Sequence, residues 1–303
     1  MDEKKEICGV LPVNKHAGCT SLDIVNMIRR LYGTRRVGHT GTLDPMATGV
    51  LVVLLGRAAK AADLIVNDRK RYRATLRLGL TTDTEDITGK VLSRCDELPT
   101  RERVEEVCRT FVGEIAQVPP MYSAIKVGGR KLVDLARQGI EVEREARKVR
   151  VFSLDITPTD RSDEYILDAE CSGGTYIRTL CADIGAALGC GGAMASLERK
   201  LCGGFDISES FTVETLGNMT EEERLACLRP VESLFCDLPE LKLAPFYERL
   251  CRSGCEIYQK KIGTAFPVGE RLRISGKNGF FALGEVRDYP DGSAVKTVKL
   301  FEL

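Results

Sequence analysis

The segment Arg35–Leu51 reads RRVGHTGTLDPMATGVL and runs directly into the apolar residues 52–55. Glycine, threonine and proline at this density disfavour a helix or a regular strand, so the sequence predicts an irregular loop held against a buried strand. Loops positioned by a rigid scaffold often carry catalytic groups. Asp44 is the single acid of this segment, which makes it the candidate catalytic group. The alternative is that Asp44 and Thr42 only cap a turn, as Asp-Pro pairs often do.

The overall composition is that of an ordinary globular protein. The chain has 303 residues, of which 43% are hydrophobic and 29% charged, enough for one large domain and one small one. No apolar run approaches the roughly 20 residues of a membrane-spanning helix, and the charged N-terminus is not followed by a signal-peptide core. We therefore expect no membrane contact and a cytoplasmic location.

The cysteines and histidines do not form a metal-binding pattern. Twelve cysteines occur without a Cys-x-x-Cys pair, the closest spacing being Cys251 to Cys255, and the chain has only two histidines. A zinc site normally needs four such ligands at short spacings. We expect no metal, and thiols that remain reduced.

The charge is balanced over the whole chain but not along it. The net charge is zero, whereas residues 1–80 hold 14 lysines and arginines against 7 acids, including the run at residues 69–73. RNA binding needs a local basic surface rather than a basic total. The alternative is a solvated charged face without a ligand.

Periodicity and turn residues outline the remaining elements. A helix should begin at Thr20–Ser21 and end at Gly33, because apolar residues recur at helical spacing between these points. We expect further helices over about 58–66 and 100–112 and from Ile177 to Gly189, and strands over about 9–15, 71–80, 149–157 and 164–171. Beyond Leu238–Glu240, short strands at 271–275, 280–286 and 294–301 indicate a small all-β module.

Several motifs together resemble one known family. Gly-His-Thr-Gly-x-Leu-Asp-Pro-x-Ala-Thr-Gly-x-Leu at residues 38–51 is similar to the catalytic loop of the TruB pseudouridine synthases, which isomerise uridine 55 in the T-loop of tRNA. Residues 15–21, 81–89, 121–147 and 172–180 match further family motifs in the same order. The resemblance covers residues 9–205, and it departs from the family at His16, where a proline is usual.

The resemblance implies a fold as well as a function. We expect an α+β catalytic domain over residues 1–238, with a mixed, largely antiparallel central sheet and flanking helices. Residues 121–147 would form an insertion that grips RNA. Residues 240–303 would form a small β-barrel-like domain of the RNA-binding PUA type.

The resemblance also implies roles for individual residues. Asp44 would be the nucleophile, and Arg178 would pair with it and lower its pKa by roughly 1–3 units. Tyr72 would stack on the uracil, since a phenol with a pKa near 10 is a poor base at neutral pH. The remaining contacts to the flipped uridine would come from His39, Tyr176 and Leu197. Contacts to the RNA backbone would come from Lys15, Arg71, Lys126, Arg130 and Lys131.

The expected function is therefore that of a tRNA pseudouridine-55 synthase. The substrate partner is the T-arm of tRNA, no cofactor is needed because substrate and product are isomers, and we expect a monomer that needs no protein partner. One alternative is an RNA-guided synthase of the H/ACA type, against which the continuous insertion and the absence of long basic tails argue. The other is a non-catalytic RNA-binding or tRNA-folding protein, which would not need Asp44, Tyr72 and Arg178 together.

Overall fold

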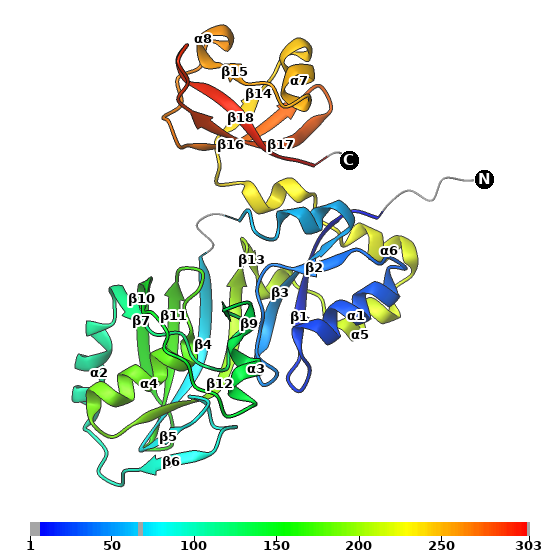
Figure 1. The fold of residues 1–303 in the computed structure, drawn as a ribbon. Helices are drawn as coiled ribbons and strands as arrows, with labels where there is room; N and C mark the ends of the chain where they lie inside the picture. Colours follow the sequence, from blue (N-terminus) through cyan, green and yellow to red (C-terminus); the bar gives the residue numbers. More distant parts are fainter. Residues whose placement is uncertain (1–6, 66–68, 302–303) are drawn as a thin grey trace.

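A computed structural model describes residues 7–65 and 69–301 (Figure 1). Its main sheet has nine strands in the order β1-β3-β12-β4-β11-β10-β7, with β2 beside β3 and β13 beside β12. All neighbours are antiparallel except β3 and β12, so the predicted mixed, largely antiparallel sheet with helices is confirmed. The strands are β1 Gly9–Lys15, β2 Val37–His39, β3 Thr48–Leu55, β4 Lys70–Leu78, β7 Gly113–Gln117, β10 Arg147–Pro158, β11 Glu164–Cys171, β12 Gly192–Cys202 and β13 Phe205–Asp206.

Four helices pack on one face of this sheet and enclose its larger apolar core. They are α1 Ser21–Leu31, α2 Arg101–Thr110, α4 Ile177–Leu188 and α5 Val213–Asn218. The predicted start of α1 is confirmed, because Thr20 forms a capping box with Asp23. Its predicted end is confirmed as well, since Gly33 adopts a positive φ of 59° after the last turn.

The opposite face of the sheet contributes to a second apolar core. Val10, Val52 and Leu54 pack there with Phe235, which belongs to the 3-10 helix η3 Val231–Phe235. Aromatic and aliphatic side chains of the C-terminal sheet complete the same cluster, namely Phe280, Leu283 and Phe301. The two sheets therefore share one continuous core.

The C-terminal sheet has five strands in the order β14-β16-β17-β18-β15. The three strands predicted there are confirmed, and two short ones at the edges were not foreseen. The elements are β14 Glu240–Lys242, α7 Pro245–Arg252, β15 Ile257–Tyr258, α8 Gln259–Ile262, β16 Arg271–Gly276, β17 Gly279–Arg287 and β18 Ala294–Leu300. A division of the chain at residues 238–240 coincides with the start of this sheet and stays a prediction.

The remaining elements are short. They are η1 Gly56–Ala61, β5 Leu80–Thr82, β6 Val91–Arg94, β8 Lys126–Val127, β9 Arg130–Lys131, α3 Leu132–Ala136, η2 Ile207–Glu209 and α6 Glu221–Ala226. The helix expected over 58–66 is instead η1, and the end of that prediction lies outside the described residues. Ala58 and Ala61 both point into the core, which the three-residue repeat of a 3-10 helix allows. No helix within 7–65 and 69–301 is long and apolar enough to cross a membrane.

Candidate active site

The Asp44 loop connects β2 to β3 and is anchored to the body of the protein through its backbone. The hydroxyl of Ser21, at the start of α1, donates to the Leu43 carbonyl (3.1 Å) and accepts from the Leu43 amide (2.8 Å). The Ala47 amide donates to the Asp44 carbonyl (3.1 Å), closing a turn around Pro45. Asp44 is thus presented by a fixed turn, with its side chain 31% exposed.

Arg178 in the first turn of α4 forms the predicted pair with Asp44. Its Nε lies 3.0 Å from Asp44 Oδ2, and its Nη2 donates to Asp44 Oδ1 at 3.4 Å, a two-pronged arrangement that fixes the carboxylate plane. The same guanidinium donates to the carbonyls of Tyr122 (2.8 Å) and Thr84 (3.2 Å). One buried cation, 6% exposed, therefore joins the Asp44 loop, α4, the polar loop after β5 and the base of the insertion.

Asp86 is a second carboxylate at this site, and the sequence analysis did not assign it a role. It is buried, with Oδ2 3.6 Å from Arg178 Nη1, while its Oδ1 accepts hydrogen bonds from Thr84 and Thr88. The motif at residues 81–89 was a signal for this loop. The motif did not indicate which of its acids points inward. Asp83, in the same motif, lies at the surface, where its Oδ1 accepts a hydrogen bond from the Lys90 amide.

The pKa of Asp44 is raised above its ordinary value. Burial is the largest cause, and the nearby Asp86 carboxylate adds to it, while Arg178, Lys15 and Arg199 act in the opposite direction. Arg178 acts in the expected direction and lowers the pKa of Asp44, but the net shift is upward because burial is the larger cause. The arginine does favour the ionised form, but the loss of hydration outweighs it.

This direction predicts the pH dependence of the reaction. A carboxylate acts as a nucleophile only when ionised. With Asp44 in that predicted role, activity should be present above its pKa and lost as the pH falls through it. We expect the acid limb of kcat/KM to lie above the ordinary aspartate pKa of about 3.9. A pH–rate profile under single-turnover conditions, with substrate binding measured at each pH, tests this. A limb at or below that value would contradict it.

Lys15 corrects one of the predicted RNA contacts. Its side chain is fully buried, and the ammonium donates to the carbonyls of Ala47 (2.7 Å), His16 (2.9 Å) and Pro45 (3.3 Å). The prediction that Lys15 binds the RNA backbone is therefore wrong, since no surface of it remains for RNA. Lys15 instead holds the loop on the C-terminal side of Asp44, and burial lowers its pKa.

Tyr72 and Arg71 lie on opposite faces of β4, because successive side chains of a strand alternate. Tyr72 is buried on the helix-covered face, and burial raises its pKa, which favours stacking over proton transfer. Arg71 projects to the other face and pairs with Asp206 at 2.6 Å. Arg71 therefore faces away from the Asp44 site, and its predicted contact to the RNA backbone stays a prediction.

The other residues predicted to contact uridine come from three different elements. His39 ends β2, and its Nδ1 is buried without a hydrogen-bond partner in the described part of the chain. Burial and the charge of Arg199 lower its pKa, which favours the neutral imidazole. Leu197 of β12 is buried in the same core as Tyr72. Tyr176 precedes α4, and the Gln117 amide clamps its backbone through two hydrogen bonds of 2.8 and 3.0 Å.

The insertion carries the predicted basic hairpin. Lys126, Arg130 and Lys131 are exposed on β8 and β9, which are joined by Gly128 and Gly129, both with positive φ. Two such glycines suit the tight turn of a hairpin. These three cations are therefore available to a ligand.

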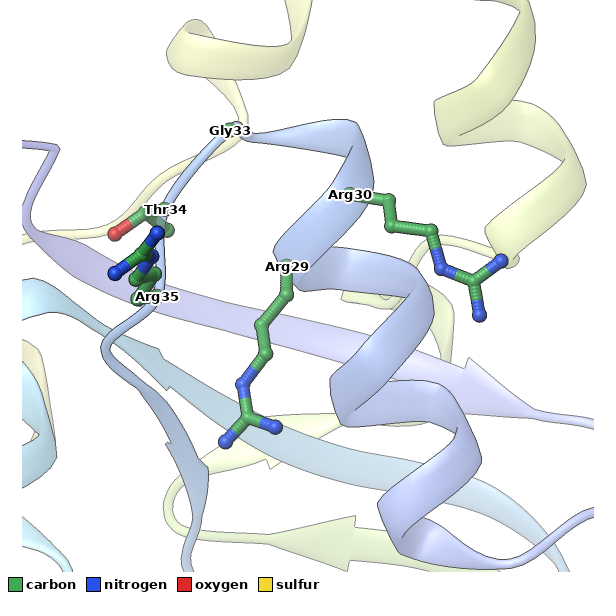
Figure 2. Close-up of a pocket in the computed structure, with 5 residues that line it drawn as sticks. All are labelled: Arg29, Arg30, Gly33, Thr34 and Arg35. Atoms are coloured by element: carbon green, nitrogen blue, oxygen red, sulfur yellow. The ribbon is translucent and has the colours of Figure 1, made fainter.

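A pocket lies away from Asp44, between the C-terminal end of α1 and the turn that follows it (Figure 2). Its volume is about 360 Å³, and it is lined by Arg29, Arg30, Gly33, Thr34 and Arg35. The Arg29 guanidinium donates to Asn26 Oδ1 (2.8 Å) and to the Val37 carbonyl (3.1 Å). No aromatic ring or carboxylate is among these lining residues, so the pocket offers neither a stacking surface nor an acidic catalytic group. Within 7–65 and 69–301, no three His, Cys, Asp or Glu side chains are grouped to hold a metal ion.

The sheet and the loop that it carries define the class of the protein. Two solved complexes share the fold, an H/ACA RNP bound to a substrate RNA (TM-score 0.72, 21% identity) and a Cbf5-Nop10-Gar1 complex (TM-score 0.71, 24% identity). Each match covers 97% of this chain and 85% of the solved one, and it shows the pseudouridine synthase fold.

Sequence comparison identifies the family. Residues 29–177 match the N-terminal domain of TruB family pseudouridylate synthases, and residues 178–235 match the C-terminal domain of tRNA pseudouridylate synthase B. The chain is 41% identical over 279 residues to tRNA pseudouridine synthase B of Clostridium tetani, covering 91% of this chain and 95% of the relative. It is 43% identical over 280 residues to that of Syntrophotalea carbinolica, covering 91% and 90%. The chain belongs to the TruB family of pseudouridylate synthases.

Proposed function

We propose that this protein is a tRNA pseudouridine synthase that isomerises uridine 55 in the T-loop. The observation that carries the proposal is the ion pair between Arg178 and Asp44, with 3.0 Å between Nε and Oδ2. Asp44 lies in the loop that the N-terminal TruB family model covers. Relatives at 38–43% identity over most of the chain bear the name tRNA pseudouridine synthase B, which supports tRNA as the substrate.

The reaction breaks the bond between C1′ of the ribose and N1 of uracil and joins C1′ to C5. The proton on C5 is lost and N1 gains one, so atoms balance without a cofactor. Asp44 supplies the nucleophile, as the carboxylates of retaining glycosidases do. Arg178 orients the carboxylate and favours its ionised form, so the nucleophile is in place before the uridine arrives.

The target uridine must leave its stack before it reaches Asp44. Flipping a base costs a few kcal/mol, which contacts in the new position must offset. Tyr72 offers the uracil a stacking surface, and Leu197 an apolar wall. His39 offers a buried Nδ1 that has no hydrogen-bond partner among the described residues and that a polar group of the ribose or base would satisfy.

The test is direct. Purified protein is incubated with an unmodified tRNA transcript, and pseudouridine is mapped along the product. We expect modification at uridine 55 alone, and none in a transcript with cytidine at that position. If the protein binds tRNA but forms no pseudouridine, the alternative of a non-catalytic tRNA-folding protein would be supported. Product formed only with an added guide RNA and partner proteins would favour the H/ACA alternative.

The basic hairpin predicts how RNA binding depends on salt. Replacing Lys126, Arg130 and Lys131 with alanine should raise KM for tRNA roughly tenfold with little change in kcat, because none of them is among the charges that act on Asp44. The slope of log affinity against log salt should become shallower by roughly 0.7–0.9 for each phosphate that the variant no longer neutralises. Titrations at several salt concentrations measure it, and an unchanged slope would remove the hairpin from the RNA interface.

We also propose that residues 240–303 act as a PUA-like RNA-binding domain, and that the protein works as a monomer in the cytoplasm. The five-stranded sheet at this position supports the domain assignment. Comparing affinity for whole tRNA with affinity for an isolated T-arm hairpin tests it. Equal affinities would place the whole RNA interface on the catalytic domain.

A further inference from the structure

Arg199 is a buried charge beneath the Asp44 loop for which the proposed function has no role. It lies on β12 with 1% of its surface exposed. Its Nε donates to the Val50 carbonyl (2.7 Å) and its Nη2 to the Gly41 carbonyl (3.0 Å). These two carbonyls lie on either side of Asp44 along the chain, so one guanidinium ties together the two ends of the loop.

The backbone contact between β3 and β12 makes this grip possible. Gly49 of β3 pairs with Arg199 in the parallel part of the sheet. A Cβ atom at Gly49 would lie 2.2 Å from the Arg199 carbonyl oxygen, and the φ of Gly49 is +99°. Only glycine lets the loop approach β12 this closely, and the approach brings the Val50 carbonyl to the guanidinium.

Arg199 differs from the other anchors of the loop in both geometry and charge. Ser21 is neutral and holds Leu43 alone, while the Lys15 ammonium holds Pro45 and Ala47 on one side of Asp44. The planar guanidinium directs two donors toward carbonyls that are nine residues apart in sequence. A lysine presents a single point from which both carbonyls are hard to reach.

The charge of Arg199 acts on several side chains of the site. Arginine remains protonated in proteins, so this buried positive charge is permanent. Together with burial, it lowers the pKa of His39. For Asp44 and Tyr72, whose pKa values burial raises, it acts in the opposite direction, and on Asp44 it is the weakest of the causes named above. The other charged groups that act on Asp44 are Arg178 of α4, Asp86 of the polar loop and Lys15 of β1.

We propose that Arg199 is a positioning residue of the isomerisation, which fixes both ends of the Asp44 loop and places a permanent buried charge beneath it. The inference rests on the proposed function, because it concerns the same nucleophile. It assigns no contact between Arg199 and the uridine, since almost none of its surface is accessible. The competing explanation is that Arg199 only fills space in the core.

Four variants separate charge from packing. Arg199→Met removes the charge and keeps much of the length, and Arg199→Lys keeps the charge but weakens the two-carbonyl grip. Ser21→Ala removes a neutral anchor of the same loop. Arg73→Met is the matched control, because Arg73 lies on the neighbouring strand β4 but is exposed on the other face, paired with Asp168.

Arg199→Met should lower kcat roughly 100-fold or more, since a displacement of about 1 Å at a reacting group costs that much, with KM for tRNA little changed. The acid limb of its pH–rate profile should move to higher pH. Arg199→Lys and Ser21→Ala should both lose activity, but the acid limb of their pH–rate profiles should stay where it is in the wild-type protein. Arg73→Met should match the wild-type protein in both respects. An unmoved limb in Arg199→Met, or a full kcat, would overturn the proposal.

The carboxyl of Asp44 gives a readout that does not need turnover. Carbon-13 NMR titration of Asp44 should show its midpoint at higher pH in Arg199→Met than in Arg199→Lys. If Arg199→Met does not fold, Arg199→Lys carries the test. The proposal requires this variant to lose activity while the titration midpoint of Asp44 stays at its wild-type pH. Absence of pseudouridine from the unmodified protein would refute the proposed function, whereas equal midpoints in folded variants would refute the role of Arg199.

Discussion

Replacing Asp44 with asparagine is expected to reduce pseudouridine formation about 10⁴-fold or more, the scale seen when a nucleophile is removed from other enzymes. An amide cannot attack C1′ at a useful rate, and no second carboxylate takes the place of Asp44. Asp86 is buried and occupied by the hydroxyls of Thr84 and Thr88. tRNA affinity should stay within about threefold, because the anchors of the loop act on its backbone rather than on the carboxylate.

Single-turnover assays and filter binding measure the two effects of Asp44→Asn. Asp168→Asn is the matched control, since Asp168 also receives two nitrogens of an arginine, Arg73, at 2.9 Å each, but on the exposed face of the sheet. The control should retain full activity. A normal rate in Asp44→Asn would leave the fold assignment intact and remove Asp44 as nucleophile.

Replacing Arg178 with methionine is expected to affect both rate and stability. Two carboxylates, Asp44 and Asp86, would lose their shared cation, and the carbonyls of Thr84 and Tyr122 would lose a donor. Removing one partner of a buried ion pair typically costs about 3–5 kcal/mol of unfolding free energy. The rate should fall about 10³-fold, and the acid limb should move to higher pH because a cation that favours the Asp44 carboxylate is gone.

Denaturant unfolding and a pH–rate profile of Arg178→Met separate these consequences. Arg73→Met removes an arginine of similar pairing at the surface, and should change the free energy of unfolding by no more than about 1 kcal/mol. Arg178→Lys should recover part of the stability but little of the rate, since an ammonium cannot hold both oxygens of Asp44 in one plane. An Arg178→Met protein of normal stability and low activity would mean that Arg178 acts on the substrate alone.

Local signals in the sequence were enough to predict much of the catalytic sheet and its helices. The apolar residues at helical spacing between Thr20 and Gly33 predicted both ends of α1 to within two residues, because helix caps and glycine stops act locally. The parallel pairing of β3 with β12 was not foreseen. Thr48 and Glu198, which pair there, are far apart in the chain, and no local pattern reports such contacts.

The site was predicted in its chemistry and only partly in its geometry. The family motif gave Asp44 and Arg178, and their contact follows from the fold. Lys15 was misjudged because a lysine is normally exposed, and only the surrounding carbonyls show why this one is buried. The position of Arg71 was readable, since strand alternation places it opposite Tyr72. The role of Arg199 could not be predicted, because its two carbonyl partners are far from it in the sequence and no local pattern indicates them.

The core shared by the two sheets has a consequence for how the C-terminal module can be studied. Phe280 and Phe301 pack with Phe235 and with the back of β3, so truncation at residue 238 would strip apolar side chains from the catalytic sheet itself. An uncovered patch of this kind promotes aggregation. If a shortened protein fails to bind tRNA, the failure would therefore reflect damage to the catalytic domain and not the loss of an RNA contact made by the C-terminal module. Substitutions confined to the outer surface of β15 and α8 leave that core intact and isolate what the module itself contributes.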